Sequence, residues 1–174
     1  MKTYLFLILF VFEFTSSSFG QNKNSIPLDV KYNRTYVTVR IGKLIIPNIL
    51  LDTGFSYDGL MIFNPSYRDS LDLSRAFEVQ VGGAGSGDAA RALMIDSSSF
   101  SLGSTIMVNQ PLIIMQGNTG LGSNGIIGYS IFGHFLTEFD YDKNIMTLYN
   151  SDLIQIDNSW TTIPIYFKND IQIC

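Results

Sequence analysis

Hydrophobic and polar residues alternate along most of the chain. The alternation is clearest in residues 35–41 and 77–81, and a period of two is typical of strands with one buried face. Residues 48–51, at the end of a nearly continuous apolar run, predict a strand that is buried on both faces. Only residues 65–75 and 130–136 are patterned for short helices. The pattern therefore predicts an all-β fold with many short strands and one or two short helices.

Turn residues divide this pattern into hairpins. The glycine-rich residues 82–87 separate strand 77–81 from the apolar residues 89–95, and they predict the tip of a hairpin. Further turns are predicted at Gly103 and at residues 142–144. These turns thus connect predicted strands that follow one another directly in the sequence.

Composition narrows the class of protein. The 174 residues suit a single domain with its own core, and 46% hydrophobic against 15% charged residues exclude a disordered chain. The net charge is −4 and no block of Lys and Arg occurs, which argues against a nucleic-acid partner. Cys174 is the only cysteine and His134 the only histidine, so an internal disulfide and a Cys/His zinc cluster are excluded. We predict neither a metal nor an organic cofactor.

The first twenty residues have the pattern of a secretory signal peptide. Lys2 precedes the apolar residues 4–12, and the small residues Ser18 and Gly20 fit a signal-peptidase site. The apolar run is too short to span a membrane. We therefore expect residues 1–20 to be removed and the chain to be exported to the periplasm or outside the cell, with no membrane span in its mature form.

Asp52-Thr53-Gly54 is the first candidate for chemistry. Asp52 directly follows the apolar run, where a carboxylate is partly withdrawn from water. Gly54 allows a tight turn beside it. The tripeptide alone also fits an ordinary turn at the end of a strand, in which the Asp side chain caps nearby amides.

The residues around this tripeptide favour a functional role for Asp52 over an ordinary turn. Residues 49–54, followed far along the chain by 125–128 (Gly-Ile-Ile-Gly), resemble the two motifs of the retropepsin and pepsin-like aspartic proteases (clan AA), and most closely the exported bacterial type. The resemblance covers roughly residues 30–150. It implies an acid-protease lobe, a closed β-barrel with one or two short helices, in residues 21–150.

The resemblance also assigns roles to particular residues. Asp52 would be the catalytic aspartate, Thr53 the residue whose hydroxyl locks two active-site loops together, and Gly54 the loop glycine. The segment around residues 81–87 would be the flap that covers a bound peptide or protein substrate. The residues that would contact the substrate there are Gly82, Gly83, Ala84 and Gly85.

The chain departs from the family pattern in three places. Phe55 is bulkier than the usual residue after the glycine, and the flap has no tyrosine. Only one Asp-Thr/Ser-Gly is present, because residues 96–98 (Asp-Ser-Ser) lack the glycine. Peptide hydrolysis by this chemistry needs two carboxylates that share a proton. The second must come from a homodimer mate or from a second lobe.

The end of the chain bears on that choice. Residues 161–168 predict a new strand and residues 171–174 begin another. Residues 151–174 are therefore extra strands, either the start of a truncated second lobe or an edge strand or dimer arm.

Two readings from other classes remain open. Gly120, Gly122 and Gly125 match G-x-G-x-x-G with Asp140 twenty residues after the first, as in a dinucleotide-binding oxidoreductase, although such a site requires a βαβ unit. The second reading is a catalytically inactive β-barrel that serves as an interaction or dimerisation module. His134 has neither a cysteine nor a G-x-S-x-G serine as a partner, so we interpret it as a histidine on the surface or at a helix end.

Overall fold

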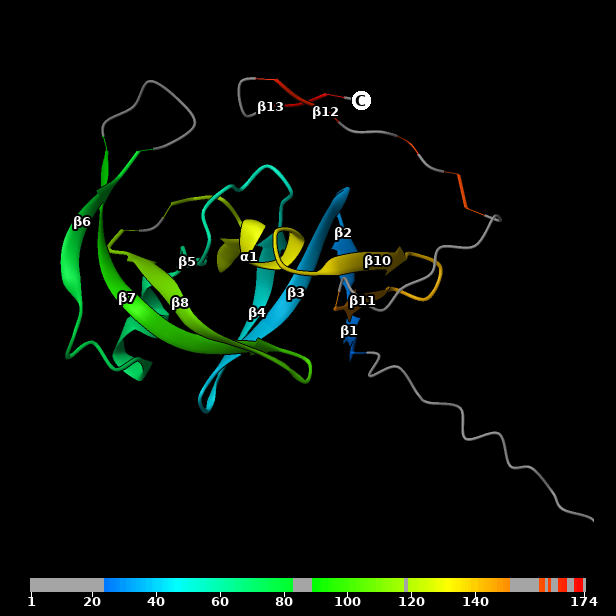
Figure 1. The fold of residues 1–174 in the computed structure, drawn as a ribbon. Coiled ribbons are helices and arrows are strands. Elements are labelled where there is room, and N and C mark those ends of the chain that lie inside the picture. The colour runs from blue at the N-terminus through cyan, green and yellow to red at the C-terminus, as the bar shows by residue number, and fades with distance from the viewer. Residues whose placement is uncertain are drawn as a thin grey trace, which may run out of the picture.

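The computed structural model describes residues 24–82, 89–117, 119–150, 160, 161 and 163, and the backbone of residues 166–168 and 171–173. Strands dominate this part of the chain, as predicted (Figure 1). Two short helices accompany them, the 3₁₀ helix η1 (Pro65–Ser70) and α1 (Tyr129–Phe132). The strands are β1 (Asn24–Pro27), β2 (Asp29–Lys31), β3 (Arg34–Ile41), β4 (Leu44–Leu51), β5 (Leu60–Ile62), β6 (Phe77–Val81), β7 (Ala90–Leu102), β8 (Thr105–Met115), β9 (Gly125–Ile127), β10 (Leu136–Asp140), β11 (Ile145–Tyr149), β12 (Tyr166–Lys168) and β13 (Ile171–Ile173).

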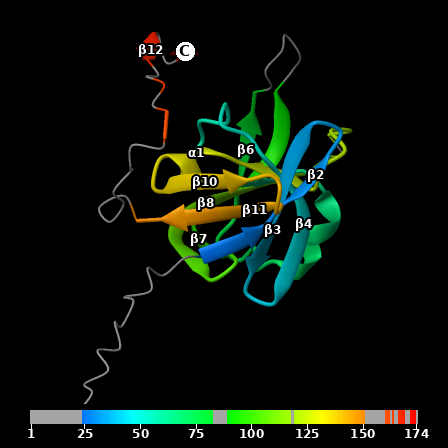
Figure 2. The same ribbon diagram turned by 90° about the vertical axis from the view of Figure 1, so that its right-hand side faces the viewer.

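Eight of the strands form one sheet in the order β2-β3-β4-β9-β5-β8-β7-β6. A further pairing, Arg40 with Ser101, connects β7 back to β3. β1, β11 and β10 form a second sheet and lie side by side in Figure 2. β12 and β13 pair with each other and, in the part of the chain that the structure describes, with no other strand; β12 covers the last three residues of the strand predicted at 161–168.

The main core contains the inward-facing residues of both sheets. Val39, Ile49 and Ile114 of the large sheet and Met146 of β11 are fully buried in one cluster. Alternation in the sequence locates most of these positions correctly, because every second side chain of a strand points to the same face.

The prediction that residues 48–51 are buried on both faces is correct only for Ile49. Ile49 is fully buried, whereas Asn48, Leu50 and Leu51 are half-buried. Between the pairs Val37–Ile49 and Val39–Ile46, two residues of β4 oppose one residue of β3, which is a β-bulge. Asn48 lies in this bulge with a φ of 56°, a conformation that Asn tolerates better than most residues. The sequence pattern does not show the bulge, because Pro47 and Asn48 sit inside an apolar run.

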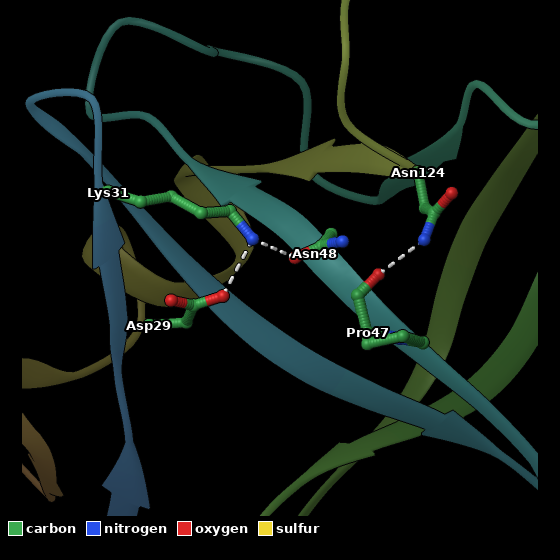
Figure 3. A network of polar contacts seen from close by, with 5 residues as sticks. All are labelled: Asp29, Lys31, Pro47, Asn48 and Asn124. Atoms are coloured by element: carbon green, nitrogen blue, oxygen red, sulfur yellow. Dashed lines mark hydrogen bonds and ion pairs between the residues drawn. The ribbon is translucent and has the colours of Figure 1, made fainter.

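Polar side chains hold the bulge in place (Figure 3). The Lys31 ammonium donates to Asn48 Oδ1 at 2.6 Å and pairs with Asp29 at 2.8 Å. On the other side of the bulge, Asn124 Nδ2 donates to the carbonyl of Pro47 at 2.8 Å. The bulge is therefore fixed by β2 on one side and by the segment before β9 on the other.

Both predicted helices are present but shorter than their patterns suggested. Pro65 begins η1, and Asn64 caps it by accepting from the backbone N–H of Ser66 at 3.0 Å. α1 spans one turn. The predicted β10–β11 hairpin is confirmed, and Asp140 Oδ1 accepts from the backbone N–H of Lys143 at 3.0 Å in its turn.

Asn24 connects β1 to the β7–β8 turn. Its Nδ2 donates to the carbonyl of Leu102 at 3.0 Å, and its Oδ1 accepts from the backbone N–H and hydroxyl of Ser104 at 2.9 and 2.8 Å. Asn24 is 9% exposed, so Asn24→Ala leaves these groups without partners in a nearly dry place. We expect the free energy of unfolding, measured with urea, to fall by about 2–3 kcal/mol. Ser25→Ala, at the exposed neighbouring position, is the matched control, and an equal loss in both variants would contradict this role.

Candidate active site

Asp52 lies at the point where β4 ends, and its backbone continues the pairing with β9. The Asp52 N–H donates to the carbonyl of Ile127 at 3.1 Å, one residue beyond the parallel β4–β9 pairing. β9 in turn pairs antiparallel with β5, so it lies between β4 and β5. The loop of residues 52–59, which joins β4 to β5, therefore passes over the end of β9. We call this loop the Asp52 loop.

The Asp52 carboxylate is held by its own loop. Its Oδ1 accepts from the Gly54 N–H at 2.8 Å, and its backbone carbonyl accepts from the Phe55 N–H at 3.1 Å. A Cβ on Gly54 would lie 3.2 Å from Oδ1, so a side chain at this position would crowd the Asp52 carboxylate. Oδ2 has no hydrogen-bond partner among the residues that the structure describes. Asp52 is half-buried, and its second oxygen is free to bind a water or a ligand.

Gly128 allows the Asp52 loop to pack against the end of β9. A Cβ at Gly128 would lie 2.3 Å from the carbonyl oxygen of Asp52 and 2.4 Å from that of Phe55. The N–H of Tyr129 donates to the same Phe55 carbonyl at 2.9 Å. The structure thus brings together the two segments, 49–54 and 125–128, on which the family resemblance rests.

Thr53 lies on the surface of the Asp52 loop. It is exposed, and its hydroxyl makes no hydrogen bond with the residues that the structure describes. Any interaction that locks it to another loop must therefore involve a group outside this part of the chain.

A hollow of about 510 Å³ opens beside Asp52. Its wall combines the Asp52 carboxylate, the cation of Arg34 and apolar side chains such as Phe63 and Leu121. Phe63 is the aromatic residue on this wall. Phe100 is buried in the main core, Tyr67 packs against that core, and Phe77 is exposed on β6.

The β6–β7 hairpin is the segment to which the resemblance assigns the flap. The last β6–β7 pair before the tip of the hairpin is Val81 with Ala90, and Gly82 follows Val81. Gly83, Ala84 and Gly85, the other predicted contact residues, lie outside the described residues. Figure 1 shows the β6–β7 and β2–β3 hairpins rising at the same end of the fold.

The base of this hairpin and the Asp52 loop share a second apolar cluster. Val79 and Met94 of the hairpin and Phe55 and Tyr57 of the loop all pack against a cluster that includes buried Met61. Burial, and after it the charges of Asp96 and Asp58, raise the pKa of the Tyr57 hydroxyl above its usual range.

His134 has a partner that sequence analysis did not find. Its Nε2 lies 3.0 Å from Asp58 Oδ2, and both side chains are nearly half exposed. The contact joins the segment after α1 to the Asp52 loop across 76 positions of sequence. A local pattern carries no signal for such a pair, since neither residue is unusual in its own segment.

The structure explains the G-x-G-x-x-G match without a nucleotide. Gly120 and Gly122 have φ values of 68° and 70° in the loop before β9, where glycine is favoured. A Cβ on Gly125 would lie 2.3 Å from the carbonyl oxygen of Met61, so packing against β5 requires glycine there. The helix that follows β9 spans four residues, and the described residues contain no βαβ unit around this loop.

Two further classes of site were sought in the described residues. No group of three or more His, Cys, Asp and Glu side chains among them is arranged to hold a metal ion. None of their helices is long and apolar enough to cross a membrane.

Comparison with protein-family models gives no match to this sequence, and comparison with curated proteins gives none either.

Proposed function

We propose that the chain is a lobe of an aspartic-type endopeptidase, with Asp52 as its catalytic carboxylate. The observation that carries the proposal is the geometry of the Asp52 loop. Asp52 follows β4, β9 lies between the two strands that the loop connects, and Gly128 allows the loop to contact β9 closely. This arrangement holds one carboxylate oxygen on a backbone N–H and places Asp52 on the wall of the hollow.

The sheet pairings support the corresponding fold, a closed β-barrel lobe of the acid-protease type. From β3 to β7, six strands follow one another in the large sheet, and the pairing of Arg40 with Ser101 connects the last to the first. A sheet that closes on itself gives the hollow a rigid wall.

The proposed reaction is the hydrolysis of a peptide bond by water. Asp52 and a second aspartate hold one water and share one proton, because two carboxylates about 3 Å apart cannot both ionise; aspartic proteases are the standard example. The ionised member takes a proton from the water, which attacks the carbonyl carbon. The protonated member donates to the carbonyl oxygen, which gives a tetrahedral diol. The C–N bond then breaks as the member that took the proton of the water donates it to the leaving amine nitrogen, and the other member takes a proton back from a diol hydroxyl as the new carboxyl group forms. The Gly54 N–H holds Asp52 Oδ1 in place, and the carboxylate keeps further lone pairs with which to hold the water.

The second aspartate comes from a twofold-related copy of the chain or from a second lobe. The exposed Thr53, whose hydroxyl has no partner in the described part of the chain, supports either source. In a symmetric dimer, the same residue of the mate meets it at the twofold axis.

We propose that a peptide or protein substrate lies extended across the Asp52 loop and under the β6–β7 hairpin. Backbone hydrogen bonds then supply affinity, and pockets supply selectivity. The chemistry needs no metal or organic cofactor, and we place the enzyme in the periplasm or outside the cell.

The test uses an unfolded protein as substrate and mass spectrometry of its fragments. We expect internal cleavage, fastest at acidic pH, where one carboxylate of the pair is protonated. If the mate supplies the second Asp52, specific activity rises with chain concentration in parallel with the dimer seen by sedimentation. A chain that is monomeric and inactive at every concentration would contradict the dimeric enzyme, and a dimer without cleavage would favour the interaction module.

A further inference from the structure

The hollow beside Asp52 has one cation on its wall, Arg34, which the proposed reaction does not use. Arg34 is the first residue of β3 and is exposed. The β3–β4 pairing ends at Tyr36 and Leu50, two residues from Arg34 on one strand and two residues from Asp52 on the other. Arg34 and Asp52 both line the hollow.

Arg34 has no anionic partner in the part of the chain that the structure describes. The ion pairs found there are those of Lys31 with Asp29, His134 with Asp58 and Lys143 with Asp140, so none joins Arg34 to Asp52. Arg34 also sits directly opposite Lys31 in the β2–β3 pairing, where two like charges are unfavourable. Lys31 is neutralised by Asp29, whereas the guanidinium of Arg34 is left for an anion from outside.

The apolar part of the wall strengthens the attraction of Arg34 for an anion, although Asp52 on the same wall carries a like charge. Phe63 and Leu121 are apolar, and low-dielectric walls strengthen the field of a charge beside them. The guanidinium presents paired N–H donors that match the two oxygens of a carboxylate. A peptide in this hollow carries carboxylates either on Asp and Glu side chains or at its own C-terminus.

We infer that Arg34 is a specificity-determining residue that binds a carboxylate side chain of the substrate, so that the enzyme prefers peptides with Asp or Glu close to the cleaved bond. This inference rests on the proposed function. An extended peptide that crosses the Asp52 loop passes the wall on which Arg34 lies, and residues on both sides of the cleaved bond remain attached to it. A side-chain carboxylate is therefore favoured over a chain terminus.

The test compares two amidated peptides that differ only by Glu or Gln at one position near the cleaved bond. We expect kcat/KM to be about tenfold higher for the Glu peptide, with most of the difference in KM, because the ion pair forms before the chemical step. Arg34→Gln should remove the preference, and Arg34→Lys should keep part of it. Arg40→Gln, an exposed arginine on the same strand but outside the hollow, is the matched control and should keep it in full.

Two further measurements separate the alternatives. A Gln peptide with a free C-terminus tests the second source of the carboxylate: if only this peptide depends on Arg34, the side-chain assignment is wrong. Binding of both amidated peptides to Asp52→Asn is measured by titration, independently of cleavage. Binding that favours Glu through Arg34, without cleavage by the wild-type chain, would support the carboxylate site and contradict the proposed function. If the wild-type chain cleaves peptides but shows no preference for Glu, or shows one that Arg34→Gln does not remove, the inference is contradicted and the proposed function still stands.

Discussion

Asp52→Asn should abolish peptide cleavage, with kcat reduced at least about a thousandfold, the scale of general acid–base catalysis. A carboxamide has the shape of a carboxylate but cannot accept the proton of the attacking water. Its oxygen can still accept from the Gly54 N–H, so the turn of the Asp52 loop is preserved. The measurement is the initial rate of peptide cleavage across the acidic pH range. Normal activity in this variant would overturn the assignment.

Asp58→Asn is the matched control for this substitution. Asp58 lies on the same loop, but its carboxylate is directed to His134 and is nearly half exposed. The lost ion pair contributes little, about 0–1 kcal/mol for an exposed pair. We expect cleavage within about threefold of wild type and an unchanged melting temperature in both variants. An equal loss in the two variants would mean that charge on the loop, rather than the carboxylate of Asp52, supports activity.

Gly128→Ala should destabilise the fold by about 3 kcal/mol or more and remove cleavage as well. The added Cβ would lie 2.3 Å from the carbonyl oxygen of Asp52 and 2.4 Å from that of Phe55. Both are backbone atoms, so neither can move aside by changing a rotamer, and the Asp52 loop itself must shift. Urea unfolding measures the first effect, and peptide cleavage measures the second.

Gly117→Ala makes the same chemical change in open space. Nothing lies within 4 Å of a Cβ at Gly117, and its φ is not positive. We expect wild-type stability and activity from it. If Gly128→Ala behaved like Gly117→Ala, the close contact between the loop and β9 would not be what positions Asp52.

Local sequence pattern predicted most of the fold. Most of the strands, the two short helices and the β6–β7 and β10–β11 hairpins follow from alternation and turn residues, both of which act between residues close in sequence, whereas β1, β2 and β5 were not predicted. The pattern failed at residues 48–51, where Asn48 adopts a positive φ and a bulge replaces regular pairing. The apolar run at residues 48–51 correctly indicates that Ile49 is buried, but it does not indicate the bulge at the neighbouring Asn48.

The candidate site was only partly predictable for a related reason. Asp52 could be singled out, because a carboxylate directly after an apolar strand is unusual. Arg34 and the His134–Asp58 contact could not, because an exposed arginine at a turn or a lone histidine is ordinary in its own segment. Their positions depend on the β3–β4 register and on how α1 is placed, which are properties of the assembled sheet.

The position of β9 between β4 and β5 has a consequence for the order of folding. β4 and β5 precede β9 by more than sixty residues, yet neither pairs with the other, and β9 supplies the partner that each lacks. Contacts between distant segments form slowly, because a long loop must close first. During synthesis, the Asp52 loop therefore has nothing to pack against until residues 125–128 have been made and have inserted between β4 and β5. The Asp52 carboxylate therefore acquires its final position only after this part of the sheet has assembled.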